Sequence, residues 1–201
     1  SGDQNQARAT AAEVYTQILK DLNEAEADLP SSYGTNATLN TTRAHKNTAI
    51  ALKTRVYLNM GQWANVITES NKLVPNAAPW NAPTGVANGL LANVATVYTN
   101  YTSAEAILSM PFTSLDVPGT QNGLGWYYIP GPNGGGEYAL NLTAPGIAAD
   151  PGWRNEDARK GLLVVSGGQT WLRKFPNPNT AADWSPVIRY AEVMLNLAEA
   201  L

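Results

Sequence analysis

The sequence contains no cysteine and a single histidine, His45, among its 201 residues. The lack of cysteine excludes disulfides, thiolate nucleophiles and cysteine-ligated metal sites. A single histidine excludes a metal cluster or catalytic motif that needs two histidines from this chain. No second metal ligand stands at a telling spacing from His45, so we predict a helix-start or surface residue without a catalytic role. No metal or other cofactor is expected.

Charge is scarce as well, at 14% of the residues against roughly 25% in an average soluble protein. Thirteen Lys and Arg against sixteen Asp and Glu give a net charge of −3. The basic stripe that a nucleic-acid-binding protein needs is therefore missing. No run of about 18 apolar residues is present, which excludes a membrane-spanning helix. Residues 1–6 have no apolar core, so no secretory leader is expected there.

The chain is instead rich in apolar and aromatic residues. Hydrophobic residues make up 44%, and six Trp and nine Tyr stand against two Phe. Such a composition excludes a disordered chain, and the length fits one domain.

The first third of the sequence predicts helices. Thr10 and Glu13 have the spacing of a capping box, after which apolar residues recur every three or four positions. The polar residues 31–42 predict a loop. Gly61 separates two later helices by so short a turn that they must form an antiparallel hairpin, with Trp63 in its core. The three helices are expected over residues 10–29, 43–60 and 63–74.

The middle of the chain is irregular. A short helix over residues 90–98 and a buried strand over 105–112 are expected. Residues 113–152 are rich in Gly, Pro and Asn, and a loop of that length inside a domain is typically functional or disordered. The aromatics within it favour an ordered loop.

Regular structure returns near the end. Residues 162–165 and 170–175 predict two strands joined by a glycine turn. Ser185 and Pro186 have the pattern of a helix N-cap and first residue, which predicts a helix that runs to Leu201. That helix has no stop signal, so we expect the sequence to be a section of a longer protein.

Several segments together resemble the SusD/RagB family. The string YLNMGQWANV, from Tyr57 to Val66, has the inner turn of a tetratricopeptide-like helix pair. Its companions appear in the family's order, and the last of them is the most diagnostic. The matching segments are residues 11–30, 43–74, 105–112, 156–160 with 171–175, and 187–201.

The resemblance implies a mainly α fold, with a tetratricopeptide-like helical hairpin scaffold, a long loop-rich segment and a few short strands. Residues 1–201 would form one domain fragment. Its expected parts are a helical scaffold over residues 10–75, a loop-rich ligand-binding part over 76–184 and a returning scaffold helix over 185–201.

The resemblance also implies a function without catalysis. Such proteins bind glycans or other nutrients on the outer membrane of Bacteroidetes-type bacteria and deliver them to a TonB-dependent, SusC-like transporter. They are lipoproteins, and the lipid-bearing N-terminal cysteine is not in this chain. Any membrane contact would therefore be through an anchor inferred from the family alone.

Exposed aromatic rings beside amide side chains are the expected ligand site, because rings stack on sugar faces while amides bond hydroxyls. Trp126, Tyr127 and Tyr128 offer the rings and Asn122 the amide, on the glycine-rich loop. In an extended segment Trp126 and Tyr128 would share a face. The alternative is that these rings pin the loop to the scaffold.

Other aromatic residues divide between binding and packing. Trp80, with Asn81 beside it, is a second binding candidate, and Trp153 beside Arg154 is a third. Trp171 and Trp184 are expected in the core.

Two other functions stay open. One is a tetratricopeptide-type scaffold that grips a peptide, and the other is a carbohydrate-active enzyme. An enzyme needs paired carboxyl groups, but Asp150, Glu156 and Asp157 lie among basic residues, which favours ion pairs on a solvated face. On the last helix, Arg189 and Glu192 have the spacing of an i,i+3 pair.

Overall fold

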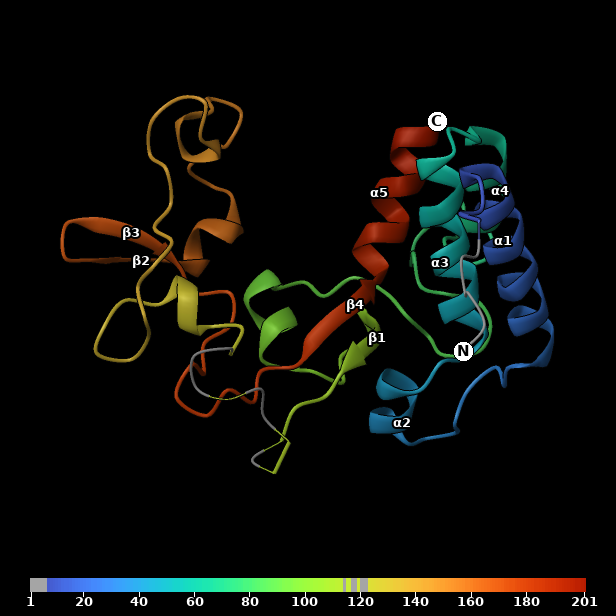
Figure 1. The fold of residues 1–201 in the computed structure, drawn as a ribbon, viewed down its shortest axis with the longest axis horizontal. Coiled ribbons are helices and arrows are strands. Elements are labelled where there is room, and N and C mark those ends of the chain that lie inside the picture. Colours follow the sequence, from blue (N-terminus) through green and yellow to red (C-terminus); the bar gives the residue numbers. More distant parts are fainter. Residues whose placement is uncertain (1–6, 114, 117–118, 120–122) are drawn as a thin grey trace.

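The structure is a computed structural model that describes residues 7–113, 115–116, 119 and 123–201. Helices gather on one side of the molecule and the loop-rich residues 123–180 on the other (Figure 1). A two-stranded sheet lies between the two sides (Figure 1).

Helix α1 (Ala11–Asp28) begins as predicted. The Glu13 amide donates to the Thr10 hydroxyl at 3.3 Å, and the Thr10 amide donates to the Glu13 carboxylate at 2.8 Å. This reciprocal capping box satisfies two of the amides that a helix start leaves free.

Helix α2 (Ala37–Thr42) corrects the prediction of a loop over residues 31–42. The Asn36 side chain accepts from the Leu39 amide at 3.0 Å, so this short helix has an ordinary N-cap within a polar stretch. Thr41 is buried on the side that packs near strand β1 (Ala106–Met110).

Helices α3 (Lys46–Asn59) and α4 (Trp63–Ser70) form the predicted antiparallel hairpin. Gly61 has φ +66°, the left-handed conformation that the turn requires. The expectation of Trp63 in the core is wrong, because 47% of the residue is exposed. It is the first residue of α4, directly after the turn at Gly61, and its ring is only partly covered there.

His45 caps α3, so the predicted helix-start position is confirmed, but the residue is fully buried. Within the described part of the chain, neither ring nitrogen of His45 has a hydrogen-bond partner. Burial disfavours the charged ring and lowers the pKa of His45 below 6.5.

The loop-rich side contains only short elements. Strands β2 (Leu163–Ser166) and β3 (Gln169–Leu172) pair antiparallel and are joined by a turn at Gly167 and Gly168, both with positive φ, which confirms the two predicted strands. The other short elements on this side are the 3₁₀ helices η3 (Trp126–Tyr128), η4 (Ile147–Ala149) and η5 (Ala158–Leu162), whereas the 3₁₀ helix η1 (Val94–Tyr98) precedes β1.

Strand β4 (Ser185–Arg189) replaces the first turns of the predicted last helix, and α5 (Tyr190–Ala200) follows it directly. The Ser-Pro cap pattern is local, whereas pairing with β1 offers backbone hydrogen bonds and burial. Ser109 pairs with Pro186 and Leu108 with Ile188, which is 1% exposed. Pairing with β1 therefore prevails over the local preference.

Helix α5 returns to the helical side and packs on α3 and α4. The Tyr190 hydroxyl donates to the Leu73 carbonyl at 2.8 Å inside the core. The buried core contains Ile50, Ala51, Leu73, Val74, Ala82, Ile107, Ile188, Tyr190 and Val193.

Two ion pairs hold α5 and β4 in place, and neither is the predicted pair of Arg189 with Glu192. Arg189 lies in a strand, where the helical i,i+3 spacing does not apply, and it pairs with Glu105 at 2.5 Å. Glu192 instead accepts from Arg55 of α3 at 2.5 and 2.7 Å. The side chains therefore link distant elements.

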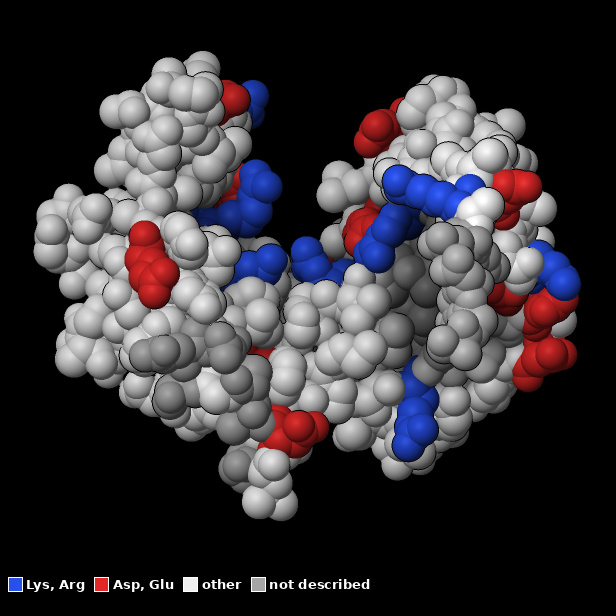
Figure 2. All heavy atoms as spheres, in the orientation of Figure 1, with Lys and Arg blue, Asp and Glu red and all other residues white. Residues whose placement is uncertain are grey.

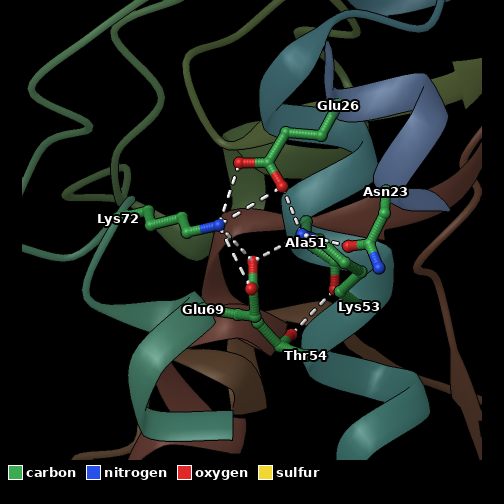
Figure 3. A network of polar contacts seen from close by, with 7 residues as sticks. All are labelled: Asn23, Glu26, Ala51, Lys53, Thr54, Glu69 and Lys72. Atoms are coloured by element: carbon green, nitrogen blue, oxygen red, sulfur yellow. Dashed lines mark hydrogen bonds and ion pairs between the residues drawn. The ribbon is translucent and has the colours of Figure 1, made fainter. Parts of the chain in front are cut away.

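A buried ion network ties α1, α3 and α4 together (Figure 3). Lys53 of α3 is 1% exposed and contacts the carboxylates of Glu26 and Glu69. Lys72 contacts the same two carboxylates, at 2.9 Å in each case. Burial alone would raise the pKa of Glu26, but hydrogen bonds from the two lysines outweigh it and lower that pKa.

No helix within the described ranges is long and apolar enough to cross a membrane.

Candidate functional site

The site that the sequence favours lies on the loop that starts with η3. The loop folds back on itself after Tyr128: the Gly135 amide donates to the Trp126 carbonyl at 2.8 Å. The amides of Glu137 and Tyr138 both donate to the Tyr127 carbonyl at 3.0 Å. These bonds bring residues nine to eleven positions apart into contact.

The result is a cluster of three tyrosines, which we call the tyrosine platform: Tyr127, Tyr128 and Tyr138. The Tyr138 ring lies 5.9 Å from that of Tyr127 and 6.0 Å from that of Tyr128, centroid to centroid. Tyr138 is 58% exposed and Tyr128 is 41% exposed. Rings held at this spacing with open faces offer an apolar surface edged by hydroxyl groups.

Tyr138 is the member of the platform that is not among the binding residues predicted from the sequence. The feature of the sequence that indicates Tyr138 is the glycine run before it, residues 134–136. These glycines allow the tight chain reversal that brings Tyr138 to Tyr128. A Cβ on Gly134 would lie 2.2 Å from the Ile129 carbonyl oxygen, so that position has no room for a side chain.

Trp126 differs from the tyrosines because its ring packs within the loop. A Cβ on Gly135 would lie 2.5 Å from the indole Nε1, so the ring rests against the glycine backbone. Trp126 is partly buried. Asn122, the amide predicted beside it, lies outside the described residues.

Trp80 and Asn81 lie elsewhere in the molecule. Trp80 is exposed and lines a cavity of about 390 Å³ with Met194 and Leu197 of α5, on the helical side. The Asn81 side chain lies against Gly89, where a Cβ would be 2.1 Å from its oxygen. The structure therefore does not bring this pair to the tyrosine platform.

The remaining tryptophans contribute to packing. Trp171 is buried, as predicted, and donates to the Ser166 carbonyl at 3.1 Å. Trp184, also expected in the core, is only partly buried and stacks on Tyr101 at 5.3 Å. Trp153 is partly buried with Lys160 5.4 Å from its ring centre.

The acidic cluster around Asp157 forms the predicted surface ion pair. Arg159 donates to both carboxylate oxygens of Asp157, and these hydrogen bonds lower the pKa of Asp157 to about 2. A carboxyl group held ionised in this way is unsuited to act as a general acid. Within the described part of the chain, no three His, Cys, Asp or Glu residues gather as a metal site would require.

A notch separates the helical side from the loop-rich side, and Lys and Arg side chains gather along it (Figure 2). It contains a largely apolar cavity of about 470 Å³. In the cavity wall, Lys174 and Arg189 lie over the Tyr98 ring, at 4.8 and 5.4 Å from its centre. Arg189 is neutralised there by Glu105.

A larger cavity of about 630 Å³ lies on the loop-rich side, and we call it the loop cavity. Its walls come from the loop after the tyrosine platform, from β2 and from the segment after β3. Its residues are Ile129, Pro130, Gly131, Pro132, Asn133, Val164, Val165, Ser166, Arg173, Pro176, Asn177, Pro178, Asn179 and Thr180.

Residues near Asp183 brace the far wall of the loop cavity. Asp183 is buried and accepts from the Tyr101 hydroxyl at 2.7 Å and from the Asn177 amide at 2.9 Å. Burial and the bond to Asp183 raise the pKa of Tyr101 to about 12, so its hydroxyl stays protonated and donates.

Comparison with known proteins gives the family. A SusD-like family model, described as "Starch-binding associating with outer membrane", matches residues 2–58. A crystal structure of a SusD superfamily protein from Bacteroides fragilis superimposes with a TM-score of 0.77 and 30% identity over 96% of this chain. These matches support the SusD family for this partial chain. The predicted mainly α, tetratricopeptide-like fold with few short strands is confirmed.

Other SusD-fold structures extend the comparison. A SusD superfamily protein from Bacteroides thetaiotaomicron matches at 22% identity and a TM-score of 0.66, over 99% of this chain and 45% of that one. Surface glycan-binding protein A from Bacteroides thetaiotaomicron, in complex with laminarihexaose, matches at 14% identity and a TM-score of 0.67, over 96% and 50%. This chain spans 40% of the Bacteroides fragilis protein. A search of curated proteins finds no match.

Proposed function

We propose that this SusD-family chain binds glycans without altering them. The observation that carries the proposal is the tyrosine platform, whose open rings stand on a loop braced by backbone hydrogen bonds. Such rings stack on the C–H face of a sugar, and a preformed surface loses little entropy when it binds. The family description as starch-binding and the laminarihexaose complex of a structural neighbour support the same ligand class.

The wider role follows from the family. A SusD-type protein would hold its glycan at the outer membrane, anchored by an N-terminal lipid, and pass it to a SusC-like, TonB-dependent transporter. The family description as associating with the outer membrane supports this location. Release to the transporter requires reversible binding, which stacking and hydrogen bonds provide and a covalent intermediate does not.

Affinity electrophoresis through gels that contain neutral or acidic polysaccharides tests the proposal. We expect retention in at least one gel and loss of retention in the variant Tyr128→Ala/Tyr138→Ala, with little change in melting temperature. Trp63→Ala is the matched control, because it removes an equally exposed ring from the helical side. No oligosaccharide product should appear after long incubation.

Three results would count against the proposal. Retention in no polysaccharide gel would favour the peptide-binding scaffold. Sugar release that depends on a carboxylate would favour an enzyme. Equal loss of retention and of folding in the tyrosine variant would make the platform part of the packing.

A further inference from the structure

We propose that the loop cavity binds an anionic sugar residue, one that carries a carboxylate or a sulfate group, through Arg173. The proposal rests on the glycan-binding function above and names the chemical class of the ligand. Residues 129–133, which line the cavity, directly follow Tyr128 on the same loop. The Gly136 amide donates to the Ile129 carbonyl at 3.0 Å, so this wall is joined to the segment that carries Tyr138.

Arg173 lines the loop cavity from its position directly after β3. The residues on either side of it line a different cavity. Leu172 and Lys174 line the cavity in the notch, whereas Arg173 lines the loop cavity on the opposite side. The Arg173 amide donates to the Leu162 carbonyl at 2.7 Å, which fixes the backbone at this point.

The Arg173 guanidinium is not neutralised within the protein. Arg55, Arg159 and Arg189 each pair with a carboxylate, but no ion pair or side-chain hydrogen bond of Arg173 occurs among the residues that the structure describes. The residues that line the cavity include no Asp or Glu. The nearby carboxylate of Asp183 is occupied by Tyr101 and Asn177. A free guanidinium presents a planar fork that matches a carboxylate or a sulfate.

The rest of the lining suits the remainder of a sugar. Ser166, Asn133 and Thr180 provide hydroxyl and amide groups for uncharged hydroxyls, and Pro130 and Pro176 provide apolar surface for a C–H face. A volume of about 630 Å³ lies within the usual range for small-molecule sites. The local positive charge of Arg173 favours an acidic sugar residue, even though the whole chain has a net charge of −3.

Affinity electrophoresis with two sets of acidic polysaccharides and one set of neutral polysaccharides tests this ligand class. Polygalacturonate, alginate and hyaluronan present carboxylates without sulfate, dextran sulfate and carrageenan present sulfates without carboxylate, and laminarin, dextran and galactan are neutral. The variants are Arg173→Gln, Arg173→Lys and the control Arg154→Gln, which removes an exposed arginine from the same side of the molecule without touching the cavity.

We expect retention by at least one acidic polysaccharide, weakened at least tenfold by Arg173→Gln, less by Arg173→Lys and unchanged by Arg154→Gln. The set that is retained decides between carboxylate and sulfate. Retention by neutral polysaccharides alone would overturn the anionic site and leave glycan binding intact. Equal weakening by the Arg173 and Arg154 substitutions would also overturn it, because a diffuse charge effect would then explain both. Retention by no polysaccharide would overturn both proposals.

Discussion

Replacing Lys53 with methionine should destabilise the protein strongly at neutral pH. The Lys53 side chain is 2% exposed and lies between Glu26 and Glu69 on neighbouring helices (Figure 3). Removing one partner of a buried ion pair costs about 3–5 kcal/mol because it leaves the other charge uncompensated. Lys72 still contacts both carboxylates in the variant, so we expect the lower end, about 3 kcal/mol. In a chain of this size that corresponds to roughly 6–12 °C in melting temperature.

The loss should depend on pH in a defined direction. The pKa of Glu26 is lowered in the folded protein, so its contribution to stability is present above its ordinary value of 4.5 and is lost as the pH falls through the lowered value. Lys53→Met removes one of the two lysines that lower this pKa. The difference between wild type and variant should therefore be larger at pH 7 than at pH 4.

Urea unfolding at pH 7 and pH 4, followed by circular dichroism, measures both quantities. Lys20→Met is the matched control: Lys20 and its partner Glu24 are both 63% exposed, and such a pair contributes about 0–1 kcal/mol. A loss below about 1 kcal/mol for Lys53→Met, or the same loss at both pH values, would refute the reasoning from the buried network.

Two further predictions concern the buried histidine and the platform loop. His45 is the only histidine, so NMR should give one imidazole titration, with a midpoint below 6.5 because burial lowers its pKa. The unfolding free energy should then decrease as the pH falls below 6.5 towards that midpoint, and His45→Gln should abolish this dependence of stability on pH. A titration midpoint at or above 6.5 would contradict the prediction for His45. Gly135→Ala should displace the Trp126 ring and weaken glycan retention with little change in melting temperature. Gly161→Ala, where a Cβ meets nothing within 4 Å, is its control, and equal retention by both variants would show that the Gly135 contact does not shape the site.

Local signals predicted α1 and the hairpin of α3 and α4, but they missed the short helix α2. Thr10 and Glu13 lie on a helix start that is exposed, so the capping box alone decides the structure there. Ser185 and Pro186 carry an equally good local pattern, yet they form a strand because β1 lies alongside. The pairing of β4 with β1 joins residues about 75 positions apart, so it cannot be predicted from the local sequence around Ser185.

The candidate site was predicted in part for the same reason. Tyr127 and Tyr128 were selected as neighbours in the sequence, whereas Tyr138 reaches them only through the fold of the loop. Trp126 was grouped with them by adjacency, but its ring packs on Gly135. Arg173 had no signal in the sequence, because its lack of a neutralising partner is a property of the folded chain.

The most direct measurement is isothermal titration calorimetry with the glycan that the protein retains best. The account predicts that Tyr128→Ala/Tyr138→Ala raises the dissociation constant by about tenfold or more, about 1.4 kcal/mol, while Trp63→Ala leaves it unchanged. Equal affinity in wild type and the double tyrosine variant, both fully folded, would contradict the claim that the tyrosine platform binds the glycan.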